Sequence, residues 1–415
     1  MRASWRTAQL ALAAALTALT GPMAAEDWPS WRGPRGDGTS LETNVPVRWS
    51  ATENVRWKAR IPGRGHSSPI VCGPRLFVTS CDEKSRARLL LCLDRADGKV
   101  LWTRTVLEAP LERRHNLNSH ASSTPATDGK LVWVSFFNPK PNQIVVACYD
   151  VEGKEVWRKV PGEFHSAHGF CSSPVPYKDM VILNADQDAK AFIVALDNAT
   201  GAERWRADRP NRTRSYCVPT VFDLAGKKQL VLSGSKCVAS YDPDTGRQHW
   251  LVDGPTDQFV ASVVATDGVV LITGGFPSLH ILGIRPDGEG NVSKSHVIWH
   301  VRKNPSYVPS PIAAGKCLFV VADNGKASCL DARTGKYHWA EQLGKHHSAS
   351  PVSAEGRLYF LADSGQTFVV EASENYELLA TNSIDERCVA SPAISGGEIF
   401  LRSEKHLWCI GAGGR

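Results

Sequence analysis

The sequence lacks most of the short motifs that identify an enzyme. Its 415 residues contain no His-Glu-x-x-His, no Gly-x-Ser-x-Gly and no glycine-rich phosphate-binding loop, so zinc-protease, hydrolase and nucleotide-binding signatures are absent. No stretch beyond the N-terminus has the long uncharged apolar run of a membrane span. Basic residues are scattered, despite a formal net charge of +6. We therefore expect no transmembrane segment and no nucleic-acid partner.

Paired cysteines are also missing. The chain has 11 cysteines but no adjacent pair and no Cys-x-x-Cys motif, and the odd number leaves at least one thiol free or paired between chains. Cys92, Cys148 and Cys329 each lie two residues before the aspartate of a repeated phrase, so they occupy one structural position in different repeats. We expect small buried side chains at this position rather than a disulfide scaffold.

The first 25 residues have the pattern of an export signal. Arg2 and Arg6 precede a short apolar run at 8–19, and the small residues Ala24 and Ala25 follow it. A run of this length indicates a cleaved signal peptide rather than a membrane span. We expect a signal peptide at 1–25 and an exported protein, either periplasmic or extracellular. No cysteine lies at the cleavage point, so we expect no lipid anchor.

A repeated phrase dominates the rest of the chain. Each copy has a short apolar stretch, an aspartate, a glycine and, four residues after the glycine, a tryptophan. The copies lie at 91–102, 147–157, 194–205, 239–250 and 328–339. Eight further segments, most of them with Ser-Pro, have an apolar stretch, a turn and a second apolar stretch; they lie at 66–80, 122–136, 172–185, 217–234, 261–274, 310–322, 350–362 and 391–403. Units of four short strands that repeat every few tens of residues predict a β-propeller.

The strand count predicts the number of blades and the way the ring closes. The last unit has no fourth strand, whereas residues 54–63 form a fourth strand, with Trp57, that has no first three before it. We therefore expect an all-β, eight-bladed β-propeller of four-stranded blades, closed by an N-terminal strand. The propeller would span 54–415, after an N-terminal extension at 26–53. The repeated tryptophan is expected to fill the wedge between blades, and the aspartate and glycine to form a hairpin turn.

The repeat resembles the pyrroloquinoline-quinone-type (PQQ-like) propeller repeat over residues 54–410. Two branches share that repeat: the quinoprotein alcohol dehydrogenases, and a non-catalytic branch that includes the outer-membrane barrel-assembly lipoprotein. The stretch at 26–40 is similar to the start of exported repeat proteins of planctomycete type. The resemblance specifies the fold far better than the function.

The chain departs from both branches. The dehydrogenase resemblance implies a vicinal disulfide over the quinone, a tryptophan floor and a calcium ion held by acidic and asparagine ligands, but the Cys-Cys pair and the long insertions are missing. The acidic residues near the first strands recur after the second strand of several units, which favours a repeated turn; they are Asp186, Asp188, Asp323 and Asp363. The assembly lipoprotein has an N-terminal anchoring cysteine, which this chain lacks.

A candidate site lies in the segments just before the first strand of each blade. In a propeller these segments gather at one mouth of the central channel, and here they are rich in histidine, arginine and tyrosine. We expect four histidines on one side of the mouth with two arginines between them, opposite two tyrosines. The candidate ligand-binding residues are Arg64, His66, His120, His168, Tyr216, Tyr307, His347 and Arg387. The four histidines are also the candidate metal ligands, whereas protonated imidazoles with arginine would bind an anion.

Three classes of function follow from these residues. The first is an exported, non-catalytic scaffold, expected to be a monomer, that binds a protein, a glycan or a small ligand at the channel mouth. The second is an alcohol- or sugar-oxidising enzyme that uses PQQ. The third is a hydrolase or lyase that uses a divalent metal bound by the histidines. No catalytic base or nucleophile is identifiable, which favours the scaffold.

Overall fold

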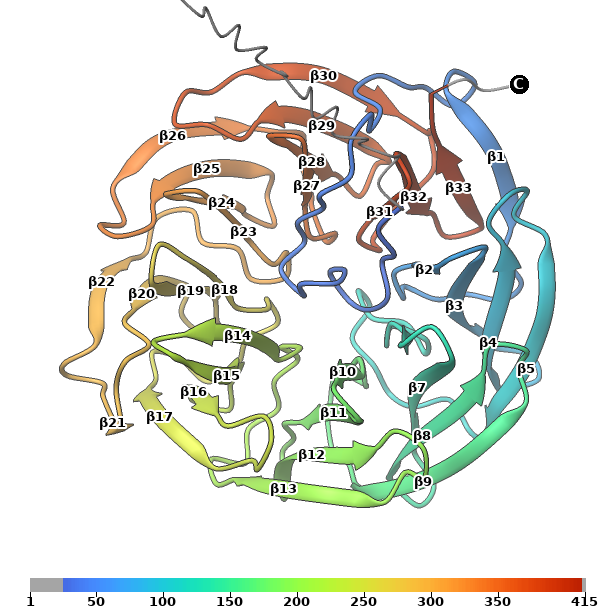
Figure 1. The fold of residues 1–415 in the computed structure, drawn as a ribbon, viewed down its shortest axis with the longest axis horizontal. Helices are drawn as coiled ribbons and strands as arrows, with labels where there is room; N and C mark the ends of the chain where they lie inside the picture. The colour runs from blue at the N-terminus through green and yellow to red at the C-terminus, as the bar shows by residue number, and fades with distance from the viewer. Residues whose placement is uncertain (1–24, 413–415) are drawn as a thin grey trace, which may run out of the picture.

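The computed structural model describes residues 25–412, so the predicted signal peptide lies almost entirely outside the described residues. Within that range the chain forms strands and turns and no helix. None of the described residues form a helix long and apolar enough to cross a membrane. The strands form eight sheets, each with four antiparallel strands, arranged as a ring, which is the predicted eight-bladed β-propeller (Figure 1).

Each blade contains three strands that follow one another in the chain and a fourth outer strand. Blades 1 and 2 consist of β2 (Ile70–Cys72), β3 (Arg75–Asp82), β4 (Ala87–Asp94), β5 (Val100–Glu108), β6 (Ala126–Thr127), β7 (Leu131–Asn138), β8 (Gln143–Asp150) and β9 (Glu155–Glu163). Blades 3 and 4 consist of β10 (Val175–Tyr177), β11 (Met180–Ala185), β12 (Ala191–Asp197), β13 (Glu203–Arg209), β14 (Thr220–Leu224), β15 (Lys227–Gly234), β16 (Cys237–Tyr241) and β17 (Gln248–Asp253).

The second half of the ring repeats this order. Blades 5 and 6 consist of β18 (Val264–Thr266), β19 (Val269–Gly274), β20 (His280–Ile284), β22 (Val297–Val301), β23 (Ile312–Ala314), β24 (Cys317–Val321), β25 (Lys326–Asp331) and β26 (Tyr337–Gln342). Blades 7 and 8 consist of β27 (Val352–Ala354), β28 (Arg357–Leu361), β29 (Gln366–Glu371), β30 (Leu378–Ser383), β31 (Ala393–Ser395), β32 (Glu398–Arg402), β33 (His406–Ile410) and β1 (Val55–Arg60).

The outer strand of blade 8 comes from the beginning of the chain. β1 pairs antiparallel with β33, with Trp57 opposite Cys409 and Arg60 opposite His406. One blade differs from the expected pattern, because the segment before β22 adds a short strand, β21 (Gly290–Asn291), parallel to β17 at the edge of blade 4. No repeat in the sequence predicts this fifth strand.

The repeated glycine and tryptophan form the contact between neighbouring blades. Trp157 of blade 2 donates its Nε1–H to the carbonyl of Asn198 in blade 3 at 2.8 Å. Its ring lies against Gly201, where an added Cβ would come 2.7 Å from the indole. Equivalent contacts join Trp57 to Arg95 and Gly98, Trp102 to Val151 and Gly153, Trp205 to Pro243 and Gly246, and Trp299 to Ala332 and Gly335. The glycine therefore has two roles. It allows the hairpin turn in its own blade, and its lack of a side chain leaves room for the tryptophan of the preceding blade.

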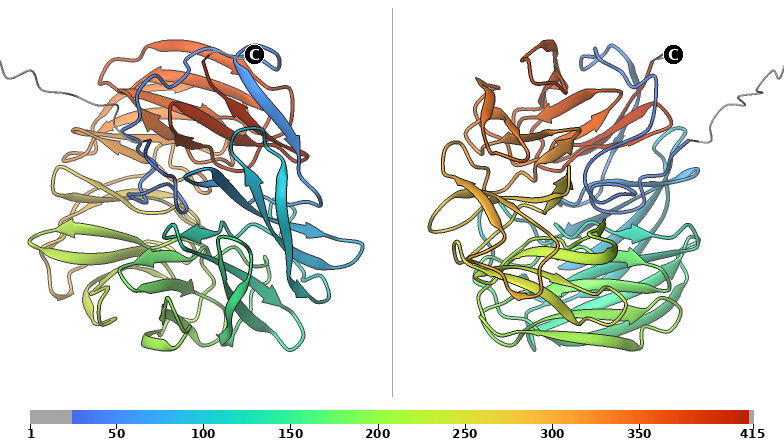
Figure 2. Two further views of the ribbon diagram at one scale, coloured as in Figure 1. Left: turned by 45° about the vertical axis from the view of Figure 1, so that its right-hand side comes forward. Right: turned by 60° about the vertical axis from the view of Figure 1, so that its left-hand side comes forward.

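The N-terminal extension fills one end of the central channel. It runs across the middle of the ring, where it appears dark blue in Figures 1 and 2. Trp28 pairs with Val71, the carbonyl of Pro29 accepts the N–H of Thr127, and Ser40 donates to the carbonyl of Ser353. Those partners lie in the innermost strands of blades 1, 2 and 7. The extension therefore lies at the end of the channel away from the segments that precede these strands.

A buried arginine anchors the extension. The Arg32 side chain is 2% exposed, and its guanidinium donates to the carbonyls of Asp37, Ser310, Pro311 and Pro351. Burial lowers the Arg32 pKa to about 10, so it remains cationic at neutral pH. The sequence identified 26–53 as an extension but did not indicate where it lies.

Candidate functional site

Two sets of loops meet at the open end of the channel. The first set precedes the innermost strands, as the sequence predicted. The second set joins the second and third strands of each blade, because antiparallel neighbours bring the end of the second strand to the same face as the start of the first. From the sequence, only the acidic residues that follow second strands were predicted for this second set, and they were assigned to a repeated turn.

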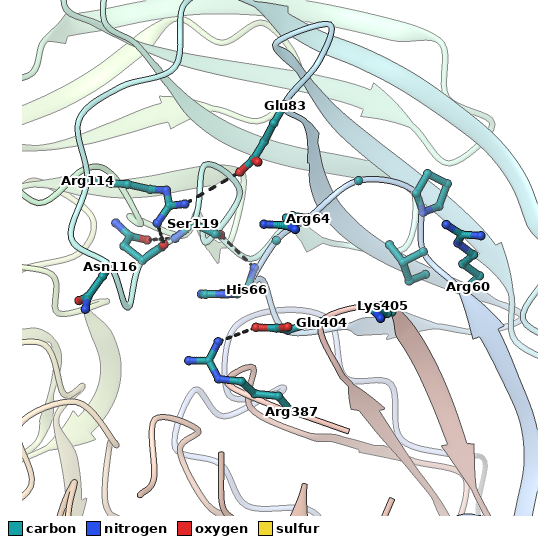
Figure 3. Close-up of a pocket in the computed structure, with 15 residues that line it drawn as sticks. Arg60, Arg64, His66, Glu83, Arg114, Asn116, Ser119, Arg387, Glu404 and Lys405 are labelled. Atoms are coloured by element: carbon teal, nitrogen blue, oxygen red, sulfur yellow. Dashed lines mark hydrogen bonds and ion pairs between the residues drawn. The ribbon is translucent and has the colours of Figure 1, made fainter. Parts of the chain in front are cut away.

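A cationic pocket of about 420 Å³ lies between blades 8, 1 and 2. Figure 3 shows His66 between Arg114 and Arg387. Glu404 pairs with Arg387, and Glu83 lies 3.9 Å from Arg114. The pocket's other cations, Arg60, Arg64 and Lys405, have no ion-pair partner among residues 25–412. Five cationic side chains thus share the pocket with two carboxylates.

A buried chain of charges holds Arg114 in this pocket. His120 accepts a hydrogen bond from Arg114 Nε at 3.2 Å, and its Nδ1 lies 3.0 Å from Glu112. Glu112 also accepts from Arg88, which is fully buried. Burial alone would raise the Glu112 pKa, but His120 and Arg88 outweigh it and hold that pKa below its usual value. His120 therefore positions Arg114 and does not line the pocket itself.

An apolar pocket of about 560 Å³ adjoins the cationic one, and Asn118 lines both. Tyr216 and Tyr307 lie in its wall, and the Tyr216 hydroxyl shares a hydrogen bond of 3.0 Å with Ser166. Its rim carries two apolar side chains that are unusually open to solvent, since Phe276 is 55% and Leu117 49% exposed. Exposed aromatic surface around a concave pocket is typical of ligand sites.

A smaller chamber of about 130 Å³ continues from the mouth into the channel. His66 belongs to both this chamber and the cationic pocket, and Tyr216 to both the chamber and the apolar pocket. Trp31 of the extension also lines it and donates its Nε1–H to Ser262 at 3.2 Å. Because the extension occupies the far end of the channel, Trp31 lies at the inner end of this chamber, opposite the open mouth.

The eight candidate residues fall into three groups. Arg64, His66 and Arg387 share the cationic pocket, and His168, Tyr216 and Tyr307 share the apolar one. The expected division between a histidine side and a tyrosine side therefore differs at His168, whose ring lies 6.2 Å from that of Tyr216. His120 and His347 line neither pocket. His347 is 2% exposed and its Nε2 lies 2.6 Å from the Leu343 carbonyl.

The positive charge of the mouth comes from arginine and lysine rather than from His66 and His168. Burial, reinforced by Arg402 and Arg387, lowers the His66 pKa to about 4, and burial also lowers the His168 pKa. Both imidazoles are thus neutral at pH 7. Arg402 is itself buried, donates to the Ser67 carbonyl at 2.9 Å and has no ion-pair partner among the described residues. It adds to the positive potential beside His66.

The residues at the mouth do not match the calcium and quinone set implied by the dehydrogenase resemblance. Asp323 accepts the backbone N–H groups of Tyr307 and Val308, and Asp363 accepts that of Ser348. These carboxylates hold the loops before the innermost strands. Among residues 25–412 one group of three metal-type ligands lies together, and it is remote from the mouth and contains none of the four candidate histidines.

Asp186 serves the fold through a buried ion pair with Arg209. Its two oxygens lie 2.9 and 3.0 Å from Arg209, which also donates to Tyr241 and Gly234. We expect Asp186→Asn to cost about 3–5 kcal/mol of unfolding free energy, because it leaves a buried guanidinium without its counter-charge. Asp188→Asn is the matched control, since Asp188 pairs with Arg214 at the surface, where a pair contributes about 0–1 kcal/mol. Chemical denaturation measures both; equal losses would contradict this role.

Several residues at the mouth were not among the candidates predicted from the sequence. Arg60 ends β1, which was predicted only as a strand, and Arg114 lies ahead of the segment at 117–123 that precedes β6. Lys405 and Phe276 lie in the loops between second and third strands. The Gly-Gly-Phe-Pro stretch at 274–277 was a usable signal, because it places an aromatic residue in a loop on that face.

Comparison with known proteins places the chain in a family. The family model described as outer membrane protein assembly factor BamB matches residues 42–136, 86–341, 288–374 and 323–412. The structure of BamB from Moraxella catarrhalis matches with a TM-score of 0.59 and 11% identity, over 86% of this chain and 97% of that one. Quinohemoprotein alcohol dehydrogenase from Comamonas testosteroni matches with a TM-score of 0.67 and 13% identity, over 94% and 81%. No curated protein matches the sequence.

The two structural matches show the fold alone, because both identities are low. The family model, however, spans almost the whole described propeller. The chain therefore belongs to the PQQ-type propeller family whose model is described as outer membrane protein assembly factor BamB.

Proposed function

We propose that the protein is an exported, non-catalytic scaffold whose channel mouth binds a ligand with an anionic group beside a flat apolar part. The ligand is a small molecule, or such a group carried by a glycan or a protein. The adjoining cationic and apolar pockets carry this proposal. Guanidinium groups bind carboxylate, sulfate or phosphate oxygens in pairs, and tyrosine and phenylalanine rings pack against flat apolar groups.

The state of the carboxylates at the mouth favours binding over catalysis. Glu404 and Glu83 face arginines, and Asp323 accepts two backbone N–H groups. A general base must reach the substrate with an available oxygen. Three cations are instead available to an anion, because they have no ion-pair partner in the described part of the chain: Arg60, Arg64 and Lys405.

Three probes test the two-part site. 8-Anilino-1-naphthalenesulfonate carries both chemistries, N-phenyl-1-naphthylamine carries the rings without the charge, and inorganic sulfate carries the charge without the rings. We expect the sulfonate to bind with the highest affinity, and sulfate to compete with it. The affinity should fall as salt rises, because solvent-exposed charges are screened. Fluorescence titration and calorimetry give the affinities.

Matched variants separate the two pockets. Arg64→Gln with Arg387→Gln should weaken sulfonate binding about tenfold and leave the neutral probe unchanged. Phe276→Ser should weaken both ring-bearing probes. Arg247→Gln and Leu101→Ser change exposed residues far from the mouth and should change nothing. If the mouth variants bind all three probes as the parent does, the proposed site is wrong.

A separate assay distinguishes the scaffold from a PQQ-dependent enzyme. We expect added pyrroloquinoline quinone with calcium to give no dye-linked oxidation of primary alcohols or sugars, since the acidic ligand set and vicinal disulfide are missing. A quinoprotein dehydrogenase assayed in parallel is the positive control. Reproducible, quinone-dependent turnover that Arg387→Gln abolishes would replace the scaffold with the enzyme.

A further inference from the structure

A cluster of metal-type ligands lies on the face opposite the channel mouth, between blades 6 and 7. Donor atoms of Cys317, His338 and Glu374 all lie within 4.8 Å of one another. Cys317 begins β24 and His338 lies near the start of β26, both in blade 6, whereas Glu374 lies in the turn between β29 and β30 of blade 7. The cluster therefore bridges two blades.

A second thiol lies beside this group. β24 and β25 place Phe319 opposite Cys329 and Cys317 opposite Asp331, so the two cysteines are diagonal neighbours. Both side chains are buried in the same apolar cluster at this interface. The Cys329 sulfur is not one of the donor atoms that lie within 4.8 Å of one another, so it is a neighbouring fourth donor beside the group of three.

These donor atoms are not used by the fold. Among residues 25–412 none of the four side chains takes part in a hydrogen bond or an ion pair with another side chain or the backbone. Cys148, which occupies the position of Cys329 in blade 2, instead lies near the carbonyls of Tyr149 and Asn198.

The sequence makes this arrangement specific to blade 6. A bulge in β26 places Trp339 opposite Cys329 and Tyr337 opposite Leu330, which leaves His338 as the extra residue. Bulges re-aim side chains in this way. The same bulge position holds Leu101 in blade 1 and Val156 in blade 2, which cannot bind a metal. Blade 4 has a histidine there, His249, but Ser240 stands at the position of Cys329. The three strands of blade 6 thus supply an imidazole beside two thiols.

We propose that Cys317, Cys329, His338 and Glu374 form a zinc site that joins blade 6 to blade 7. Zinc favours four ligands of this kind, at about 2.3 Å for sulfur and about 2.0–2.2 Å for nitrogen or oxygen. The exposed side chains of His338 and Glu374 must move inward toward the buried sulfurs to reach these distances. Each thiol releases a proton when its sulfur binds the ion. Thiolate ligands disfavour magnesium and calcium.

Metal binding by the purified full chain tests the proposal. After removal of metals, the reduced protein should bind one Zn²⁺ per chain, and Co²⁺ should give the absorption of a thiolate-bound tetrahedral ion. At a zinc concentration about 100 times the Kd, the Tm should rise by about 3 °C. Any of three results would overturn the proposal. They are binding of less than one zinc ion per chain, a cobalt spectrum without thiolate absorption, and a Cys317–Cys329 disulfide in the native protein.

Matched variants locate the ion. Cys329→Ser, His338→Ala and Glu374→Gln should each weaken zinc binding, the first two by about 100-fold or more. His338→Ala and Glu374→Gln change exposed side chains, so they test the site even if Cys329→Ser does not fold. Cys148→Ser and His249→Ala are the controls, because they occupy the same repeat positions in other blades. Equal effects of controls and site variants would also overturn the site.

Discussion

Deleting residues 26–60 is expected to destabilise the protein on the order of 10 kcal/mol, which is comparable with the whole stability of a typical domain. The deletion removes β1 and with it the outer strand of blade 8. It also removes Trp57, whose Nε1–H donates to the Arg95 carbonyl of blade 1 at 2.8 Å. Loss of a packed tryptophan costs about 3–5 kcal/mol, and each lost hydrogen bond about 1 kcal/mol.

A shorter deletion separates the strand from the extension. Removing residues 26–53 retains β1 but removes Arg32 and the buried Trp28 and Trp49. We expect this variant to melt at a lower temperature than the parent but to remain folded, whereas the longer deletion loses cooperative melting. Calorimetry and circular dichroism measure both. Closely similar melting of the two truncations would show that β1 does not hold the ring closed.

The contact between blades gives the second large effect. Trp157→Ala should cost about 3–5 kcal/mol, because it empties a packed wedge and removes the hydrogen bond to Asn198. Gly201→Ala approaches the same contact from the other blade. Its φ is +67° and the new Cβ would lie 2.7 Å from the Trp157 ring, so strain and overpacking together cost about 2–5 kcal/mol.

Gly268 is the matched control for Gly201. It also has a positive φ, +73°, but an added Cβ there meets nothing within 4 Å. Gly268→Ala should therefore cost about 1–2 kcal/mol, from backbone strain alone. Denaturant unfolding of the three variants measures these differences. If Gly201→Ala and Gly268→Ala are equally destabilising, the glycine serves only the turn, and the contact adds no stability.

The sequence predicted the propeller well because the repeat records its geometry. The spacing from Gly201 to Trp205 recurs in other blades, so it reports a hairpin that every blade needs. What it could not report was the partner of each tryptophan. Trp157 contacts Gly201, 44 residues later in the next blade, and one copy of the phrase contains no information about the next.

The candidate site was less predictable than the fold. Arg64, His66 and Arg387 come together because their segments share one face, a property that follows from strand direction. His120 and His347 lie in similar segments but turn into the protein, because Glu112 and the Leu343 carbonyl bind them. These partners are close in the sequence, but no pattern in the sequence indicates that the side chains turn toward them. Trp31 lies in the N-terminal extension, outside the repeats, so the repeat pattern does not predict its position in the channel.

The most direct test of the proposed function is a crystal structure of the protein with bound 8-anilino-1-naphthalenesulfonate. The account predicts one molecule at the channel mouth, with its rings against Tyr216, Tyr307 and Phe276. Its sulfonate should lie among Arg64, Arg114 and Arg387, on the other side of Asn118. A probe that binds only elsewhere, or a mouth that stays free of it at saturating concentration, would contradict the account.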